Sequence, residues 1–373
     1  MTVKRAKTEG LFEYATLTDR QQKNAALNRE EQRQTALTLR SVPQRLVFEL
    51  TNACNLDCIM CGRDGFKQTF FDIRMLDKFV EILPEVGEVT LFGWGEPTLH
   101  PRFLALLEFF TAHPVRKYFV TNGTRLSAIQ EALFTHQVDL MAVSLDGARA
   151  ATNDRIRVRA DFAAIIANLT EVVQRRQQLG LSHPYINFVM TLMRSNLEEL
   201  PELVDLAARI GIEEVKAVYL TAFSPEMVSE VLLNEQAWVS AVFAEAIRRG
   251  EARGVTLKLP YIQGQDSAGE AAHKPCYVGW RDLFLGSDGY VRPCQSTAMK
   301  LFHFEKYPTF ARMWNSEEYQ DFRRRVNDPD TMPEECRRCY QSSHANWNRP
   351  TSFVQTGIQF APTWERPVNR TQG

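Results

Sequence analysis

Three cysteines stand close together in the segment TNACNLDCIMCGRDG, residues 51–65. They are Cys54, Cys58 and Cys61, with the spacing C-x3-C-x2-C. Thiolates select zinc, copper(I) or iron–sulfur clusters, and one short loop can hold three irons of a cubane while the fourth stays open. Zinc needs a fourth protein ligand, yet no Cys or His occurs in the next thirty residues. The spacing therefore favours an iron–sulfur cluster, with zinc and a distant fourth ligand as the weaker alternative.

The other four cysteines lie in the last third of the chain, with the spacing C-x17-C followed by C-x2-C. They are Cys276, Cys294, Cys336 and Cys339. Four thiolates complete a site, and both tetrahedral zinc and a fully ligated iron–sulfur cluster fit this pattern. The sequence therefore predicts two separate metal sites that use all seven cysteines.

Composition limits the classes of partner. Lys and Arg number 44 against 45 Asp and Glu, so the chain lacks the positive charge that binding to nucleic acid requires. The N-terminal sequence has no apolar signal core, and no stretch is apolar enough to span a membrane. We expect a cytoplasmic protein, in whose reducing surroundings clustered cysteines bind metal rather than form disulfides.

The elements that must position these cysteines alternate between short β-branched or aromatic runs and longer amphipathic ones. Six strands are predicted at residues 45–52, 88–95, 117–123, 140–147, 185–193 and 213–220. Helices are predicted between them at residues 70–84, 101–112, 127–136, 161–179 and 197–210. Six such units predict a parallel sheet with right-handed crossovers, an α/β fold in the form of a partial (β/α)6 TIM-like barrel. The cysteine loop and the motifs GWGEP, TNG and SLDG follow the first four strands, where such a barrel gathers its site.

At 373 residues, the chain is long enough for a large domain with smaller additions. A polar N-terminal arm, expected as a solvated helix or frayed segment, precedes the barrel. A helix and a strand are expected to link the barrel to a small domain made of a hairpin around SDG and a helix in SEEYQDFRRRV. The predicted divisions are the arm at 1–44, the barrel at 45–222, the linker at 223–275, the cysteine domain at 276–341 and a tail at 342–373.

Cys54, Cys58 and Cys61 followed by GWGEP at residues 93–97 resemble the signature of the radical S-adenosylmethionine (radical SAM) superfamily. The resemblance covers about residues 45–220 and implies a six-unit partial barrel. It also implies a [4Fe–4S] cluster whose open iron binds the amino and carboxylate groups of S-adenosylmethionine.

The resemblance also assigns roles around S-adenosylmethionine. Gly93, Gly95 and Glu96 would lie against its methionyl amino group, with Pro97 shaping the turn, because glycines permit close backbone approach. The remaining contacts that it implies are Asn122 and Ser144 to the ribose and carboxylate, Arg157 to the carboxylate, and Met60 and Met190 near the adenine. For Arg157 a solvated surface position is the alternative, and for Met190 a place in the core. Met60 stands where the family commonly has an aromatic residue.

The four C-terminal cysteines, with Gly289 five residues before Cys294, resemble the twitch domain, a shortened form of the SPASM extension. The resemblance covers roughly residues 276–341 and implies one auxiliary [4Fe–4S] cluster, with zinc as the alternative that thiolate chemistry allows. The spacing is close to that of the aminocyclitol dehydrogenases of this group.

These resemblances imply an enzyme that cleaves S-adenosylmethionine to a 5′-deoxyadenosyl radical and abstracts a substrate hydrogen. With every cysteine used, no thiol remains to return a hydrogen atom, which favours oxidation or rearrangement over epimerisation. The expected substrate is a small polyhydroxylated or nucleoside-like molecule, and the expected electron donor is a flavodoxin or ferredoxin. Two alternatives are a maturase that crosslinks or epimerises a ribosomal peptide and a non-catalytic zinc or iron–sulfur protein. No catalytic side chain is assigned.

Overall fold

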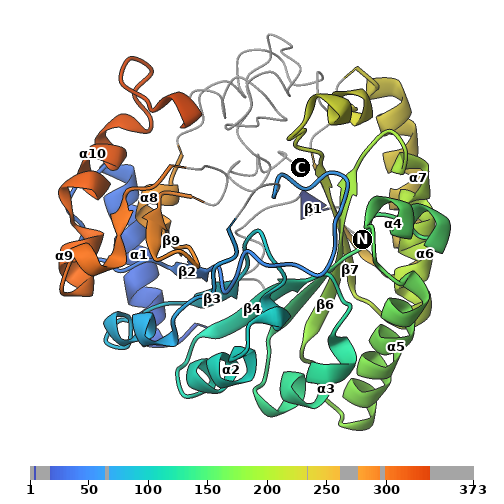
Figure 1. The fold of residues 1–373 in the computed structure, drawn as a ribbon, viewed down its shortest axis with the longest axis horizontal. Helices are drawn as coiled ribbons and strands as arrows, with labels where there is room; N and C mark the ends of the chain where they lie inside the picture. The colour runs from blue at the N-terminus through green and yellow to red at the C-terminus, as the bar shows by residue number, and fades with distance from the viewer. Residues whose placement is uncertain are drawn as a thin grey trace.

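The computed structural model describes residues 4–5, 17–63, 67–232, 234–260, 276–294 and 299–336. Within them, eleven strands form one sheet in the order β1-β8-β7-β6-β5-β4-β3-β2-β9-β10-β11. All pairings from β1 to β9 are parallel. The sheet curves into an open barrel with its larger helices outside (Figure 1), so the predicted partial barrel is confirmed.

The six predicted strands are present with slightly shorter bounds. They are β2 (Arg45–Phe48), β3 (Glu88–Leu91), β4 (Arg116–Thr121), β5 (Leu140–Ser144), β6 (Tyr185–Leu192) and β7 (Glu214–Tyr219). Apolar side chains of these strands and of the outer helices form one continuous core. Because successive side chains of a strand face opposite sides, every second residue points instead into the barrel.

Most predicted helices also lie where the sequence indicates. They are α2 (Phe103–Thr111), α3 (Leu126–Thr135), α5 (Phe162–Gln178) and α6 (Leu200–Ile210), the last preceded by the 3-10 turn η4 (Leu197–Glu199). The short helix α4 (Ala150–Ile156) was not predicted. The helix expected over 70–84 is instead the 3-10 helix η2 (Ile73–Lys78). Its backbone continues with i to i+3 bonds, such as Phe79 N to Leu76 O and Ile82 N to Phe79 O. Among the helices that the structure describes, none is long and apolar enough to cross a membrane.

The segment expected as a linker extends the barrel. The 3-10 turn η5 (Pro225–Glu230) leads to α7 (Gln236–Arg253), which packs against α6. Strand β8 (Thr256–Leu259) then pairs in parallel with β7, and β1 (Lys4–Arg5) pairs with β8. Residues 223–260 are thus part of the same sheet and its outer helical layer, because β7 would otherwise leave its backbone groups unpaired at an open edge.

The C-terminal elements join the opposite edge of the barrel. After α8 (Val278–Arg281), strand β9 (Asp282–Leu285) pairs in parallel with β2 and, through the predicted turn around Gly289, in antiparallel with β10 (Tyr290–Arg292). Gly289 has φ +77°, a left-handed conformation that suits glycine. Strand β11 (Phe302–His303), η6 (Phe304–Lys306), α9 (Phe310–Trp314) and the expected helix α10 (Glu317–Arg325) complete this region. The hairpin is therefore continuous with the barrel wall.

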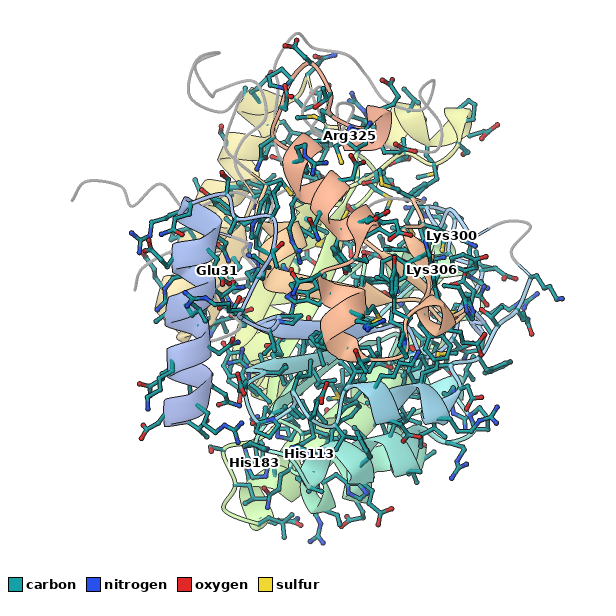
Figure 2. All side chains as sticks on the ribbon, turned by 90° about the vertical axis from the view of Figure 1, so that its left-hand side faces the viewer. Glu31, His113, His183, Lys300, Lys306 and Arg325 are labelled. Atoms are coloured by element: carbon teal, nitrogen blue, oxygen red, sulfur yellow. The ribbon has the colours of Figure 1, made fainter. Side chains whose placement is uncertain are left out.

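The described part of the N-terminal arm, from residue 17 onward, is neither frayed nor fully solvated. Its helix α1 (Asp19–Arg33) begins with a capping box at Thr18 and lies beside the barrel (Figures 1 and 2). The buried carboxylate of Glu31 accepts hydrogen bonds from the backbone of Arg40 and Ser41 and from the Ser41 hydroxyl. Polar anchors of this kind give little apolar periodicity, which is why the sequence suggested a solvated segment.

Asn28 is the central anchor of α1 and is fully buried. Its amide nitrogen donates to Ser41 Oγ at 2.9 Å and to Trp280 O at 2.8 Å, and its amide oxygen accepts from Gln44 Nε2 at 2.8 Å. We expect Asn28→Ala to lower the free energy of unfolding by about 2 kcal/mol, because it leaves these buried groups without a partner. Chemical or thermal unfolding measures the loss. Arg29→Ala, on the exposed side of the same helix, is the control, and an equal loss in both variants would contradict the anchoring role.

Candidate functional site

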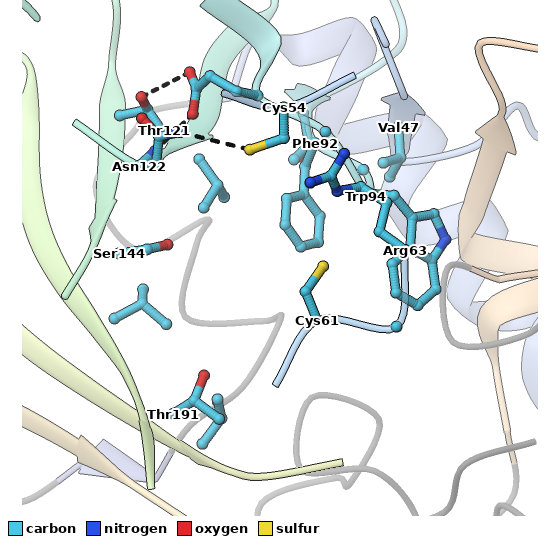
Figure 3. Close-up of a pocket in the computed structure, with 18 of the residues that line it drawn as sticks. Val47, Cys54, Cys61, Arg63, Phe92, Trp94, Thr121, Asn122, Ser144 and Thr191 are labelled. Atoms are coloured by element: carbon cyan, nitrogen blue, oxygen red, sulfur yellow. Dashed lines mark hydrogen bonds between the residues drawn. The ribbon is translucent and has the colours of Figure 1, made fainter. Parts of the chain in front are cut away.

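A cavity of about 460 Å³ lies inside the barrel (Figure 3). Its walls come from β2 to β7 and from β9, and its upper rim comes from the loops that follow the first strands. The three clustered cysteines and Cys294 are among its lining residues. The lining also includes Met60, Arg63, Gly93, Trp94, Gly95, Glu96, Asn122, Ser144, Arg157, Thr191, Thr221 and Phe223.

The loop after β2 presents all three cysteines to this cavity. Figure 3 shows the thiols of Cys54 and Cys61 pointing into the same space, with Ser144 and Thr191 projecting from the opposite wall. Backbone bonds from Asp57 N to Val158 O (3.1 Å) and from Ile59 N to Ile156 O (3.0 Å) hold the loop to the segment after β5. The side chain of Asn122 donates to Cys54 Sγ at 3.7 Å. The loop is thus fixed from two other strand ends.

The surroundings of the thiols suit ligation to a cluster. Burial raises the pKa of Cys58 to about 11, with Asp146 and the other two cysteines adding to the rise and Arg157 opposing it. Burial also raises the pKa of Cys61. Thiols of this kind lose their protons when metal binds. Within the described residues, no three candidate ligands gather closely enough to surround a single metal ion.

The GWGEP turn lies directly against the cysteine loop. A Cβ on Gly95 would stand 2.3 Å from Ala53 O and 2.4 Å from Thr51 O, and one on Gly93 would stand 2.3 Å from Glu49 Cγ. The predicted need for close backbone approach therefore arises from the protein itself, and both glycines also line the cavity.

Glu96 connects the GWGEP turn to the end of β4. Oε1 accepts from Thr98 N, Thr98 Oγ1 and Thr121 Oγ1 at 3.2, 2.7 and 2.8 Å, and Oε2 accepts from Asn122 N at 2.6 Å. Burial raises the pKa of Glu96, and these donors oppose the shift. Pro97 begins the 3-10 helix η3 (Pro97–Leu99) that Glu96 caps, which agrees with its expected part in the turn. Pro97 does not itself line the cavity.

A second buried carboxylate, Glu49, was not identified from the sequence. It accepts from Trp94 N at 2.9 Å and from Ser287 N and Oγ at 3.2 and 2.9 Å. Ser287 lies in the β9–β10 turn and is also hydrogen-bonded to the Thr69 hydroxyl at 2.6 Å. Glu49 therefore links the GWGEP turn to the hairpin that carries Cys294. Only the folded arrangement brings these three segments together.

Arg157 is buried and lines the cavity, so the alternative of a solvated surface arginine is wrong. Its Nε lies 2.8 Å from Asp146 Oδ2. Neither atom has a well-aligned hydrogen bond in the described structure, so the attraction is chiefly Coulombic. Burial raises the pKa of Asp146, and Arg157 opposes that shift. Asp146 in turn accepts from Thr191 N at 2.7 Å, which ties the arginine to β6.

Of the other residues predicted to contact S-adenosylmethionine, three line the cavity and one does not. Ser144 and Asn122 line the cavity, as does Met60, which packs beside the small apolar cluster around Ile156. Met190 does not line it. It is fully buried in the main core, while its strand neighbours Val189 and Thr191 line the cavity. The predicted adenine contact of Met190 is therefore wrong, because strand alternation turns this side chain to the outer face.

The structure describes three of the four C-terminal cysteines, Cys276, Cys294 and Cys336. Cys276 is buried, and its backbone exchanges hydrogen bonds with the Asn327 side chain at 2.7 and 3.1 Å. Cys294 and Cys336 are half-buried. Cys339 and the predicted tail at 342–373 lie outside the described residues. Because Cys294 also lines the barrel cavity, the two predicted metal sites adjoin the same space.

Several cavity residues were not assigned a role from the sequence. The rings of Trp94 and Phe223 pack edge to face, with centroids 5.3 Å apart, and form an aromatic wall of the cavity. Tyr118 and Lys216 line the lower part of the cavity from β4 and β7. The lysine at the centre of EVKAVY was a visible signal, because alternation places it on the face of the strand opposite to Val215 and Ala217, which are in the core.

Two family models match this chain, one over the region with the first three cysteines and one over the region with the last four. Residues 48–216 match the family described as radical SAM superfamily, and residues 276–340 match SPASM, described as an iron–sulfur cluster-binding domain. The second match is to SPASM, which replaces the expectation of the shortened twitch form.

Three relatives illustrate the range of similar proteins. The tungsten-containing aldehyde ferredoxin oxidoreductase cofactor-modifying protein of Pyrococcus furiosus is 26% identical over 74% of this chain and 82% of its own length. Mycofactocin maturase MftC of Mycolicibacterium smegmatis is 34% identical, but the match spans 45% of this chain and 43% of the maturase. The PqqA peptide cyclase of Gluconobacter oxydans is 25% identical over 81% of this chain and 84% of the cyclase.

Solved structures share the fold at low identity. Streptococcus suis SuiB bound to S-adenosylmethionine aligns with a TM-score of 0.63 and 16% identity over 83% of this chain and 74% of that one. SuiB bound to precursor peptide SuiA aligns with a TM-score of 0.60 and 15% identity, over 80% of this chain and 70% of that one. These likenesses show that the barrel and its C-terminal extension form a known arrangement.

Proposed function

We propose that this chain is a radical SAM enzyme that modifies a ribosomally made peptide. Residues 48–216 match the radical SAM superfamily and residues 276–340 match SPASM, so the chain has a [4Fe–4S] cluster, an auxiliary cluster and a site for S-adenosylmethionine. The observation that carries the proposal is the common cavity. Cys54, Cys58 and Cys61 meet Cys294 there, so a substrate bound in it adjoins both metal sites.

The chain's own residues have distinct parts in this proposal. When bound, the first cluster would supply the electron for reductive cleavage of S-adenosylmethionine, the chemistry that leads to removal of a hydrogen atom from a substrate carbon. Cys54, Cys58 and Cys61 hold three of its irons. Gly93 and Gly95 present their backbone to the methionyl amino group, and Arg157 attracts the methionyl carboxylate.

Further residues shape the space around the reaction. Asn122 and Ser144 offer polar groups to the ribose, and Met60 offers an apolar surface to the adenine. The aromatic wall of Trp94 and Phe223 excludes water from the reacting atoms. Cys276, Cys294, Cys336 and Cys339 would hold the auxiliary cluster, which would serve as an electron acceptor or relay.

A peptide is better supported as the substrate than the small polyhydroxylated molecule expected from the sequence. Of the proteins similar to this chain, MftC is named a maturase, and the Gluconobacter oxydans protein is named a peptide cyclase. The four C-terminal cysteines leave no spare thiol as a hydrogen-atom donor, which favours oxidative crosslinking over epimerisation. A low-potential carrier such as flavodoxin or ferredoxin delivers the electrons. Arg323, first in an arginine run of α10, is buried under Trp314 and is not part of any docking surface for it.

Anaerobic reconstitution with iron and sulfide tests the proposal. We expect roughly eight irons per chain, four for each cluster, and formation of 5′-deoxyadenosine from S-adenosylmethionine and dithionite. Cys58→Ala should lose about half of the iron and all 5′-deoxyadenosine, because one corner of the first cluster is gone. Cys294→Ala should keep 5′-deoxyadenosine formation and lose the mass change of a short peptide encoded beside the gene. Bound zinc without iron absorbance or 5′-deoxyadenosine would contradict an enzyme of this class.

A further inference from the structure

The lower part of the cavity is a layer of charged side chains from the first residues of the strands. Three buried pairs bridge neighbouring strands: Arg45 to Asp282 at 2.6 Å, Arg116 to Glu88 at 2.5 Å and Lys258 to Glu214 at 3.0 Å. Arg45 and Asp282 line the cavity directly. Asp282 is also shared with Arg281 at 2.8 Å. Each carboxylate of this layer therefore already has a cationic partner.

Lys216 adds a further positive charge to the same layer. It lies between Val189 and Lys258 in the sheet register and lines the cavity. Within the described structure, its ammonium group makes no hydrogen bond or ion pair. Burial, with Lys258 and Arg45 adding to the effect and Glu214 opposing it, lowers the pKa of Lys216 to about 8. The group therefore remains mainly protonated at neutral pH.

Tyr118 supplies a second donor to this part of the cavity. Its side chain is buried among the strands, lines the cavity, and its hydroxyl has no partner in the described structure. Burial raises the pKa of Tyr118, and the charges around it include Glu214 and Arg45, which also act on Lys216. The phenol therefore stays protonated and able to donate.

Lys216 is half-buried and lines the cavity without a hydrogen-bonded partner, so its ammonium group is available to pair with an anionic ligand. The charges that act on Lys216 are those of the lower layer, whereas those that act on Cys58 are Arg157, Asp146 and the other cysteines. Lys216 projects from within β7 beside the charges at the strand starts, whereas the cysteines lie on the loop beyond the end of β2. On this basis an anion at Lys216 belongs to the substrate rather than to S-adenosylmethionine, which binds at the cysteine end.

We propose that Lys216, assisted by the Tyr118 hydroxyl, binds a carboxylate group of the substrate at the bottom of the barrel cavity. This inference rests on the proposed function, since the anionic group of an unmodified peptide is a carboxylate. It comes either from an Asp or Glu side chain or from the C-terminus. Binding there orients the peptide with its anionic group away from the cysteines.

The test uses full-length, cluster-loaded protein saturated with S-adenosylmethionine. N-acetylglutamine carries only a terminal carboxylate, N-acetylglutamate α-amide only a side-chain carboxylate, and N-acetylglutamine amide neither. Saturation-transfer NMR measures their affinities. We expect at least one charged probe to bind about ten-fold more tightly than the neutral one, as one charge-assisted hydrogen bond provides. The probe that binds identifies the source of the carboxylate.

The variants decide whether Lys216 carries this preference. Lys216→Met should bind the charged and neutral probes equally, and Lys216→Arg should retain most of the tighter binding of the charged probe. Lys23→Met, at an exposed position on α1, should bind all probes as the unmodified chain does. Equal affinities of Lys216→Met and the unmodified chain for the charged probes would overturn the proposal. So would displacement of the probe by added S-adenosylmethionine when the titration is begun without it.

Thermal unfolding separates a binding role from a structural one. Lys216→Met should unfold at the same or a higher temperature, because no partner in the described structure is lost. A fall of several degrees would assign Lys216 to the charge pairs of the layer and overturn the proposal. Probe binding requires no turnover, so this outcome is independent of whether the chain forms 5′-deoxyadenosine.

Discussion

Gly95→Ala is expected to lower the rate of 5′-deoxyadenosine formation by about 10²-fold, the order of loss that a displacement of about 1 Å produces in an active site. The new methyl group would stand 2.3 and 2.4 Å from the carbonyl oxygens of Ala53 and Thr51. Backbone atoms cannot rotate away as a flexible side chain does, so either the GWGEP turn or the start of the cysteine loop must move. Both movements change how S-adenosylmethionine sits against the cluster.

Reconstituted protein, assayed anaerobically for 5′-deoxyadenosine and for S-adenosylmethionine binding, measures this loss. Gly180→Ala is the matched control, because its Cβ would meet no atom within 4 Å although its φ is +65°. That control should cost about 1–2 kcal/mol of stability through backbone strain and leave activity unchanged. A wild-type rate for Gly95→Ala would show that the close approach of turn and loop is not needed.

Arg157→Met is expected to lower the free energy of unfolding by about 3–5 kcal/mol. The substitution leaves the fully buried carboxylate of Asp146 without the cation whose Nε lies 2.8 Å away. It also removes the positive charge proposed to attract the methionyl carboxylate, so the affinity for S-adenosylmethionine should fall as well. Denaturant unfolding and equilibrium binding measure the two losses separately.

A double-mutant cycle isolates the pair. Arg157→Met combined with Asp146→Asn should recover much of the stability, since asparagine is neutral and its side-chain oxygen can still accept from Thr191 N. Arg159→Met, which breaks an exposed pair with Asp57 only two residues away, should cost no more than about 1 kcal/mol. Equal losses for Arg157→Met and Arg159→Met would contradict the buried charge pair.

The barrel was predictable because its signals are local. Each strand is a short run of β-branched or aromatic residues, and the cysteine loop and GWGEP follow directly on the first two strands. The unusual residues were therefore expected at one edge of the sheet. The structure adds that the two motifs touch, with Gly95 against the carbonyl oxygens of Thr51 and Ala53.

Features that depend on distant partners were not predictable in the same way. Asn28 lies in a polar helix whose sequence suggests a solvated surface. Its side chain nevertheless donates a hydrogen bond to Trp280 O, 252 positions away. Glu49 meets Ser287 across 238 positions. Lys216 stands out in its strand, but its lack of a partner depends on how Glu214 is already paired with Lys258. Such contacts follow from strand order, which no local pattern encodes.

The pairing of β2 with β9 has a consequence for how the chain matures. Arg45 and Asp282, which face each other across these strands, are 237 positions apart. During synthesis on the ribosome, the edge of β2 that pairs with β9 therefore stays unpaired until the rest of the barrel has been made. Unpaired strand edges are prone to aggregate. The loop with Cys54 follows β2, and the hairpin with Cys294 follows β9. Both predicted metal sites are therefore completed only when β9 and its hairpin have been made. Iron delivered before that stage would meet incomplete binding sites.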